Sequence, residues 1–444
     1  MEQARYTINY RATETRQVMG WIKAGQSGCL IGLRGAGKSN FLRFLLRQDV
    51  WRYYLERNWA DFAFVLIDLL ALAERSEWAV YELVLDRLSG VNEEIAEEMT
   101  SLRWEVTSSR DLLVAQRAVE RCVDALCQRP AQRIVLLFDE FDAVFRTLDP
   151  SLFRCLRAIR DAYKGQVSYL VIVANDLAHL RDDLTKVEHF CRLVSRNVCG
   201  LGPYSEADAR QMIRYLAFRR SIEMSAGDTA HLIELSGGHA GLLKATLSLL
   251  WDAHYGSDLA KLAPALSDEP AMQAECRKVW DSLPQSEQAA LYALARGAQA
   301  DVRTLPRLKR KGLVREGQPE TSLFSPLFAE FVRQQAPPST EGTAISRSPS
   351  IVRIEGRRVE TLTELEFEML CYLYEHRGRV CTKDELIENV YRQQYDRMKG
   401  GVTDQALQTL ISRLRDKIEP ERGRPRYVVT VRGQGYRFVE PGAG

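Results

Sequence analysis

Four apolar runs of strand length divide the N-terminal half of the chain, and segments with helical periodicity separate them. The runs are 29–31, 62–68, 134–138 and 169–174. A short, continuously apolar run predicts a strand that is buried on both faces, as in a parallel sheet with helices on each side. We therefore predict an α/β domain with a parallel sheet over residues 1–202.

The pattern becomes helical after residue 203. Ser205 precedes the first of these helices, with Asp208 three residues later, which is the spacing of an N-cap. We assign 203–260 to a helical segment and 270–335 to a small helical module with a hairpin. The following stretch, 336–349, is rich in Pro, Ser, Thr and Gly and is predicted to be a flexible linker.

Residues 350–444 form a further predicted domain. It begins with a short strand near Val352, and helices follow from Leu362 and from a cap at Thr382. The third helix, Val402–Ile418, has one apolar stripe, made by Leu407, Leu410, Ile411, Leu414 and Ile418. Its opposite side carries small or bidentate polar groups suited to base edges and phosphates: Gln405, Gln408, Thr409, Ser412 and Arg413.

Charge is more informative by region than in total. The net charge is only +2, but residues 392–437 hold eleven Arg and Lys against five acidic residues, an excess that attracts phosphates. The nine cysteines are scattered without a C-x-x-C pair, which favours a reduced protein with buried thiols. No apolar run is long enough to span a membrane and no secretory signal is evident, so we expect a cytoplasmic location.

A phosphate-binding loop is the clearest motif. Residues 32–39 fit G-x-x-x-x-G-K-[ST] between an apolar strand and an amphipathic helix. Such a loop curls so that its N–H groups face an anion at a helix N-terminus. Lys38 would reach the β- and γ-phosphates, and Ser39 would offer its hydroxyl to Mg²⁺. The predicted nucleotide contacts from this segment are Gly32, Gly35, Ala36, Gly37, Lys38, Ser39 and Asn40.

Acidic and polar residues follow two of the predicted strands. Asp139 and Glu140 end the 134–138 run, and Asp142 adds a third acid. We predict that Asp139 holds Mg²⁺ and that Glu140 orients or deprotonates the attacking water. Asn175 ends the 169–174 run, where it would contact the γ-phosphate or the water; a plain strand-end turn is the alternative.

Two arginines, Arg192 and Arg196, follow in the segment 190–196. Either would suit an arginine finger that acts on the nucleotide of a neighbouring subunit, and we place Arg196 in the catalytic set. The alternative is an ordinary surface arginine.

Residues 10–335 resemble the STAND class of signal-transduction ATPases, which is close to the AAA+ and origin-recognition ATPases. The resemblance rests on 32–39, 137–142, 169–175, 201–205 and 235–244. It implies that 203–260 is a lid, that 270–335 is a winged-helix module, and that 235–244 senses the nucleotide. His239 is the implied lid contact, but Ala240 replaces the family's proline, and Lys244 is another candidate.

The last domain resembles the OmpR/PhoB-type winged-helix effector domain of bacterial response regulators. The matching patterns are Leu-Thr-x-x-Glu-Phe at 362–367, the run 411–417 and the ending 431–438. The resemblance implies that the third helix enters the major groove and the hairpin the minor groove. Arg413 and Arg415 on the helix and Arg432 on the hairpin are then expected to contact DNA. Gln405 and Gln408 depart from the family, so a different target sequence is expected. A winged helix that contacts protein is the alternative.

The resulting prediction is a multi-domain, ATP- and Mg²⁺-dependent regulator that binds double-stranded DNA. A slow ATPase would serve as its switch, with nucleotide-dependent self-association and RNA polymerase as further expected partners. Three alternatives stay open: a DNA-loading ATPase for replication or transposition, a STAND-type defence or stress sensor, and a metabolic kinase. GTP is not excluded as the nucleotide.

Overall fold

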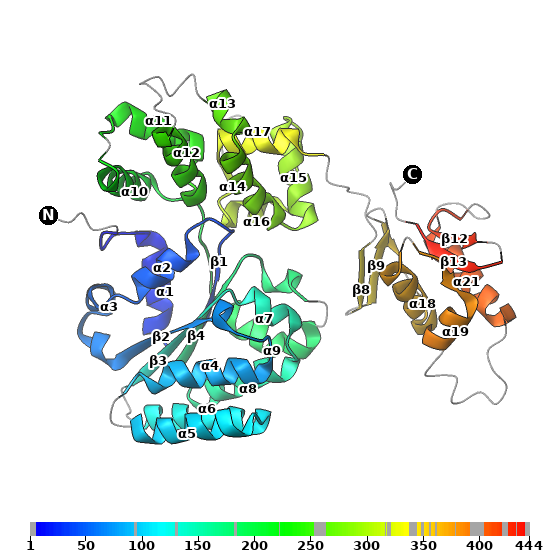
Figure 1. Cartoon of the computed structure of the whole chain (residues 1–444), viewed down its shortest axis with the longest axis horizontal. Coiled ribbons are helices and arrows are strands. Elements are labelled where there is room, and N and C mark those ends of the chain that lie inside the picture. Colours follow the sequence, from blue (N-terminus) through cyan, green and yellow to red (C-terminus); the bar gives the residue numbers. More distant parts are fainter. Residues whose placement is uncertain are drawn as a thin grey trace. The chain divides into compact units, whose positions relative to one another are not determined.

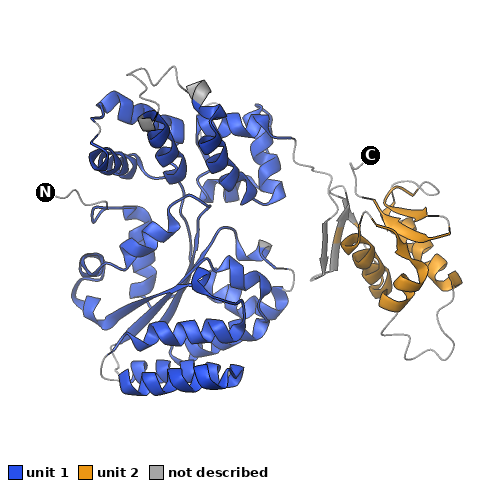
Figure 2. Ribbon diagram, in the orientation of Figure 1, with its two compact units in different colours: residues 1–337 blue, residues 338–444 orange. Residues whose placement is uncertain are grey.

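The structure, a computed structural model, divides into two compact units, residues 1–337 and residues 338–444 (Figure 2). The structure describes residues 6–92, 96–128, 132–181, 184–221, 223–252, 263–315, 317, 321–336, 344–347, 350–354, 357–359, 362–377, 379–390, 404–419, 425–431 and 433–439.

A five-stranded parallel sheet forms the centre of the first unit (Figure 1), which confirms the predicted parallel sheet. Its spatial order is β2-β3-β4-β1-β5, and every neighbouring pair is parallel. The strands are β1 (Gly28–Ile31), β2 (Phe62–Asp68), β3 (Arg133–Asp139), β4 (Val167–Val173) and β5 (Val198–Gly200). Because all five run the same way, the chain leaves β1, β3 and β4 at one edge, where ligands bind in open α/β sheets.

The apolar runs are continuous because both sheet faces are covered. In β3, Ile134, Leu136 and Phe138 belong to one hydrophobic cluster, whereas Val135 and Leu137 belong to another. Successive side chains of a strand point to opposite faces, so each face requires its own apolar residues. The helices that cover the two faces complete these two cores.

Helices from two parts of the chain cover the sheet (Figure 1). One face carries α4 (Glu77–Ser89), α5 (Ala96–Ser109), α6 (Leu112–Cys127), α7 (Asp142–Thr147), α8 (Pro150–Ala162) and α9 (Leu184–Val194). The other carries α1 (Ala12–Lys23), α2 (Lys38–Leu45) and α3 (Gln48–Leu55). Short 3-10 helices occur at η1 (Glu56–Asp61), η2 (Leu69–Ala71) and η4 (Leu177–His179).

The rest of the first unit is helical. It consists of α10 (Glu206–Arg219), α11 (Ala226–Ser236), α12 (Ala240–Asp252), α13 (Ala263–Asp268), α14 (Pro270–Asp281), α15 (Gln285–Ala295), α16 (Leu305–Arg310), the hairpin β6 (Val314–Arg315) and β7 (Ser322–Leu323), and α17 (Pro326–Gln334). The cap predicted at Ser205 is present, since its Oγ accepts the N–H of Asp208 at 3.2 Å. We call residues 203–252 the lid and 270–335 the module.

The module packs directly on the phosphate loop and the lid. Leu33 of the loop lies in the same hydrophobic cluster as Leu242 of the lid and Met272 and Cys276 of α14. The hydroxyl of Ser325 donates to the carbonyl of Leu235 at 2.6 Å, and both groups are buried. The phosphate loop, lid and module therefore share one core.

The second unit has two small sheets and three described helices. The antiparallel sheet β10-β9-β8 joins β8 (Ala344–Arg347), β9 (Ser350–Ile354) and β10 (Arg357–Val359), and the sheet β11-β13-β12 joins β11 (Cys381–Thr382), β13 (Gly435–Phe438) and β12 (Val428–Val431). The helices are α18 (Glu364–Glu375), α19 (Lys383–Val390) and α21 (Asp404–Ile418). One cluster of buried side chains, including Leu370, Leu386, Leu414 and Phe438, holds these elements together.

Two details of this unit bear on the sequence analysis. β8 lies inside the segment 336–349 that was predicted to be a linker, so residues 344–347 are a strand. β8 is an edge strand that pairs with β9. The Pro, Ser, Thr and Gly content of this segment disfavours a packed core, but an edge strand needs only backbone hydrogen bonds to one neighbour. The cap predicted at Thr382 is present, since its Oγ accepts the N–H of Glu385 at 3.2 Å. Among the described residues, no helix is both long enough and apolar enough to cross a membrane.

Candidate nucleotide site and nucleic-acid interface

The phosphate loop joins the carboxyl end of β1 to the amino end of α2. Its backbone turns through Gly35 and Gly37, whose φ angles are 80° and 88°. These left-handed conformations favour glycine, and a Cβ on Gly35 would lie 2.8 Å from Cε1 of His239. Gly37 precedes α2 without a side-chain cap, so the first N–H groups of that helix are left for another acceptor.

Ser39, Asp139, Lys38 and Glu140 meet beside this loop. The Ser39 hydroxyl donates to Oδ2 of Asp139 at 3.1 Å, and Nζ of Lys38 lies 3.7 Å from Oε1 of Glu140. Burial raises the pKa of Asp139, although the Ser39 hydrogen bond opposes the shift. The structure thus brings together the four side chains to which the sequence assigned phosphate, metal and water contacts.

Glu140 has an unusual backbone. Its φ is 52°, in the left-handed region that costs a side chain other than glycine about 1–3 kcal/mol. Such conformations persist where the surrounding structure imposes them, and they cluster at functional sites. Here the turn lifts Glu140 off the end of β3 and leaves its side chain partly exposed at 31%. The backbone therefore presents this carboxylate to a ligand.

Asp142 has a structural partner instead. Its carboxylate accepts the N–H of Ala174 at 2.9 Å, and burial raises its pKa. Asp142 thus ties the segment after β3 to the end of β4. This contact separates it from the pair formed by Asp139 and Glu140.

Asn175 is engaged by the module. Its Nδ2 donates to the carbonyl of Ser282 at 2.7 Å, and its Oδ1 accepts from Nζ of Lys311 at 2.6 Å. Lys311 also donates to Oε2 of Glu287 at 2.6 Å, and both of these side chains are 1% exposed. Burial lowers the pKa of Lys311 although Glu287 opposes the shift. We call Asn175, Glu287 and Lys311 the buried clamp; in this conformation Lys311 occupies the oxygen of the Asn175 amide and the carbonyl of Ser282 occupies its nitrogen.

His239 lies against the phosphate loop, as the STAND resemblance implied. Burial lowers its pKa to about 4, so the ring is neutral at pH 7. Its Nδ1 accepts the N–H of Leu242 at 3.4 Å, which assigns the ring proton to Nε2. Nε2 is buried without a hydrogen bond of normal geometry among the described residues, and a backbone hydrogen bond with Arg34 opposes the lowering of the pKa. The ring therefore packs against the backbone of the phosphate loop.

A cavity of about 800 Å³ opens over these groups. Gly35, Gly37, Lys38, Ser39, Asn40 and Glu140 line one side, and Lys244 of the lid lines another. Ala271, Glu275 and Lys278 of α14 also line it. Gly32, Ala36, Asp139 and His239 are not among its lining residues. The cavity, the curled loop, Lys38 and the Ser39–Asp139 pair fit a magnesium nucleotide.

Arg11 supports the loop from outside the motif, and no sequence pattern predicted its role. Its side chain is buried and donates to the carbonyls of Ala36 at 2.9 Å and Gly202 at 2.8 Å. The guanidinium also lies over the ring of Tyr204, with Cζ 4.8 Å from the ring centroid. The polar run around Arg11 gives no signal of this burial. A buried arginine that bonds two carbonyls fixes the loop to β5 and the lid.

Arg192 and Arg196 lie near the other end of the sheet. Both line a cavity beside Ser27, which immediately precedes β1, whereas the phosphate loop follows β1. Arg192 pairs with Glu188 at 2.5 Å. Neither arginine therefore joins the nucleotide site of its own chain, and the arginine-finger role of Arg196 stays a prediction about a neighbouring copy.

The exposed face of α21 carries the predicted DNA contacts. Gln405, Gln408, Thr409, Ser412 and Arg413 are all exposed, whereas the apolar stripe is buried. Arg415 differs, because its Nε donates to the carbonyl of Val428 and its guanidinium to Oγ1 of Thr430, both at 2.8 Å. It holds the helix to the hairpin. Arg432, predicted at the tip of the hairpin, lies outside the described residues.

Two family models match the chain in succession. Residues 9–323 match the model described as Novel STAND NTPase 1, and residues 356–438 match that of Transcriptional regulatory protein, C terminal. Both predicted resemblances are confirmed, and so is the fold class of a P-loop NTPase with a C-terminal winged helix.

Individual relatives align with one part or the other. The alkaline phosphatase synthesis transcriptional regulatory protein PhoP of Bacillus subtilis is 44% identical over 80 residues, which are 18% of this chain and 31% of PhoP. The chain thus spans about a third of the length of this relative. A Walker-type ATPase of Pyrococcus abyssi aligns with 73% of the chain and 95% of its own, at 15% identity and a TM-score of 0.46. The DNA-binding domain of Klebsiella pneumoniae RstA, solved in complex with the RstA box, aligns with 22% of this chain and with 89% of its own length. The identity is 29% and the TM-score is 0.18.

Proposed function

We propose that this chain, which belongs to the family described as Novel STAND NTPase 1, is a sequence-specific DNA-binding transcription regulator that is switched by ATP. The C-terminal match supports the DNA-binding output, and PhoP, a relative of that part, is named as a transcriptional regulatory protein. One observation carries the switch: the module shares a core and a cavity with the phosphate loop.

The residues beside the loop would hold ATP and Mg²⁺ by ordinary charge and hydrogen-bond chemistry. Backbone N–H groups and Lys38 bind the phosphates, and Ser39 and Asp139 hold the metal, which neutralises phosphate oxygens. Lys38 faces Glu140 at 3.7 Å, so phosphates that attract Lys38 release Glu140 to accept a proton from water. Slow hydrolysis through Glu140 would then reset the switch.

The direction of the switch follows from Glu275 on α14. Its carboxylate lines the phosphate cavity, and a Cβ on Gly35 would lie 3.6 Å from its Oε2. Lys278 pairs with the other oxygen at 2.5 Å and offsets part of this charge. Phosphates in the same cavity bring further negative charge toward Glu275. We therefore propose that ATP weakens the contact between α14 and the loop and so displaces the module.

The buried clamp opposes that displacement. Moving the module away would separate Lys311 from Asn175, and the freed amide would then be available to the γ-phosphate or the water. Asn175 would thus bind Lys311 when the module is in place, and would contact the nucleotide when ATP has displaced the module. This is a two-state element that a nucleotide can bias.

At the output end, α21 would lie in the major groove, with Arg413 and the neighbouring exposed polar residues toward the bases and phosphates. Nucleotide-dependent self-association would place two such helices on half-sites about one helical turn apart. RNA polymerase remains an expected partner of a regulator of this kind.

The test measures DNA affinity of the full chain as a function of nucleotide. A duplex selected from random DNA is titrated at fixed salt with no nucleotide, with ADP and with ATP·Mg²⁺, for the unsubstituted chain and for Lys38→Ala. ATP should change affinity or assembly in the former only. Identical binding in all three states would contradict the switch, and ATP-dependent spreading along DNA would favour a DNA-loading ATPase.

A further inference from the structure

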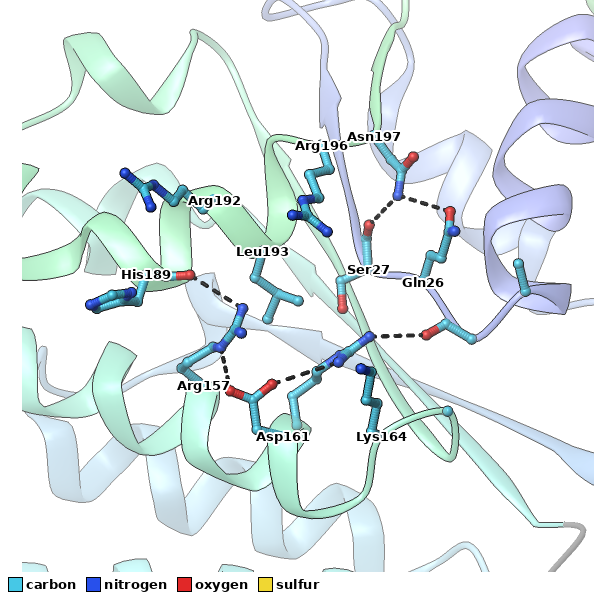
Figure 3. A pocket seen from close by; sticks show the side chains of 14 residues that line it. Gln26, Ser27, Arg157, Asp161, Lys164, His189, Arg192, Leu193, Arg196 and Asn197 are labelled. Atoms are coloured by element: carbon cyan, nitrogen blue, oxygen red, sulfur yellow. Dashed lines mark hydrogen bonds and ion pairs between the residues drawn. The ribbon is translucent and has the colours of Figure 1, made fainter.

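A second cavity, of about 620 Å³, lies beside the segment that immediately precedes β1 (Figure 3). It is bounded by the carboxyl end of α8, the carboxyl end of α9 and the turn that leads into β1. The phosphate loop leaves the other end of β1, so this cavity is separate from the nucleotide site.

Its lining is strongly cationic. Five of its fourteen lining residues are Arg or Lys and one is acidic: Arg157, Arg160, Lys164, Arg192 and Arg196 against Asp161. Cations at the carboxyl end of a helix can simply offset the helix dipole. The carboxyl ends of the two helices together contribute about one negative charge. The carboxylates of Asp161 and Glu188 contribute one negative charge each. About two positive charges are then left without a counterion.

Two of these side chains are already held in place. Arg157 donates to Oδ2 of Asp161 at 2.6 Å. Arg160 donates to the carbonyl of Gly25 at 3.4 Å and lies 3.6 Å from Oδ1 of Asp161, and its side chain is only 12% exposed. Its Nε is buried without a hydrogen-bond partner in the described part of the chain, and a buried donor of this kind is costly unless an acceptor completes it.

Two others point into the cavity unpaired. The side chains of Lys164 and Arg196 make no hydrogen bond or ion pair with any residue that the structure describes, and Figure 3 shows both among the side chains that line the cavity. The amides of Gln26 and Asn197 add neutral polar groups at its edge, joined to each other by a 3.3 Å hydrogen bond.

We propose that this cavity is a binding site for a small molecule that carries a diphosphate group. The uncompensated charge matches a diphosphate, guanidinium groups bind phosphate oxygens in pairs, and the volume is within the range of small-ligand pockets. Duplex DNA would need cations spread along an open surface, whereas these converge in one hollow. The site is independent of the switch proposed above.

The experiment titrates the full chain with inorganic pyrophosphate, without Mg²⁺, by isothermal calorimetry. Lys38→Ala is introduced first, so that the phosphate loop does not contribute. This protein should still bind one pyrophosphate per chain. Adding Lys164→Gln and Arg196→Gln should lower the affinity by about a hundredfold, roughly tenfold for each charge-assisted contact. Both residues lack partners, so the fold should be retained, which circular dichroism checks.

The control is Arg117→Gln, which removes one positive charge from an exposed position on α6, as each of the two substitutions does in the cavity, and should leave the affinity unchanged. Absence of pyrophosphate binding in Lys38→Ala, or equal affinity after the double substitution, would overturn the proposal. Pyrophosphate binding that appears only when sedimentation shows self-association would also overturn it, because the cationic cluster would then act on the nucleotide of a neighbouring copy. So would a loss of duplex DNA affinity in the double variant without any pyrophosphate binding.

Discussion

The nucleotide site and the exposed face of α21 place their functional side chains in opposite ways. Lys38 and Asp139 are buried, each paired with a neighbour within the fold. Gln405, Gln408 and Arg413 are exposed, and the contacts proposed for them are to DNA. A site whose members hold one another is organised before its ligand arrives, whereas an exposed face is ordered by binding. Substitutions should therefore affect stability and chemistry together in the first region, and affinity alone in the second.

The largest expected effect is on ATP turnover, and it should distinguish Glu140 from Asp142 after β3. Glu140→Gln should lower ATP turnover by about 10²–10⁴-fold, because it removes the general base, and should leave ATP affinity nearly unchanged. Asp142→Asn is the matched control: it keeps an oxygen to accept the N–H of Ala174 and should retain most turnover. Phosphate release and nucleotide affinity are measured for both. Full turnover in Glu140→Gln would assign the base elsewhere.

The buried clamp should give the largest loss of stability. Lys311→Met removes the close partner of the buried Glu287 and leaves only Arg307, whose Nε lies 3.9 Å from Oε1. Breaking a buried ion pair in this way typically costs about 3–5 kcal/mol in the free energy of unfolding, and Arg307 should hold the loss toward the lower figure. Urea unfolding followed by tryptophan fluorescence measures it. Arg303→Met, at an 89% exposed arginine of an ion pair with Asp301, is the control and should change stability little. Equal effects of the two substitutions would mean that the clamp is not formed in solution.

Burial of His239 in the lid should make the free energy of unfolding depend on pH. The folded pKa of His239 is about 4, below its ordinary value of 6.5, so the unfolded chain takes up a proton first as the pH falls. Stability contributed by the neutral ring is present above pH 6.5 and is lost toward pH 4, by about 2 kcal/mol at pH 5. His239→Gln should lose less stability than the unsubstituted chain between pH 7 and pH 5. Parallel losses would contradict burial of His239.

The smallest expected effect is on DNA affinity, and it compares two arginines of α21, Arg413 and Arg415. Arg413→Ala should weaken DNA binding by about tenfold and reduce the salt slope by about one unit, because it removes an exposed phosphate or base contact. Arg415→Ala should lower the melting temperature instead, since Arg415 holds the hairpin through Val428 and Thr430. Fluorescence anisotropy at several salt concentrations measures the slopes. A slope change of equal size for Arg415→Ala would place it on the DNA surface as well.

Local patterns predicted much of this molecule. The runs at 62–68 and 134–138 became β2 and β3, because apolar residues with both faces buried have few other arrangements. The loop at 32–39 was recognised because its glycines and Lys38 act through backbone geometry that is set within a few residues.

Contacts between distant segments could not be predicted in the same way. Lys311 follows Lys309 and Arg310 in the sequence, and nothing there indicates that it is buried against Asn175, 136 residues away. The resemblance implied that Arg415 contacts DNA, and no local pattern indicated that its Nε would donate to the carbonyl of Val428 in β12. Which cation is exposed depends on what packs over it, and a single sequence does not carry that information.

The contact of Arg11 with the phosphate loop has a practical consequence for anyone who trims this protein. A fragment that starts at β1 would retain the whole recognisable motif and lose the guanidinium that holds the carbonyls of Ala36 and Gly202. Its loop would be tethered at one side only. Expression fragments and affinity tags should therefore spare the residues ahead of α1, since the boundary of the motif is not the boundary of the working part.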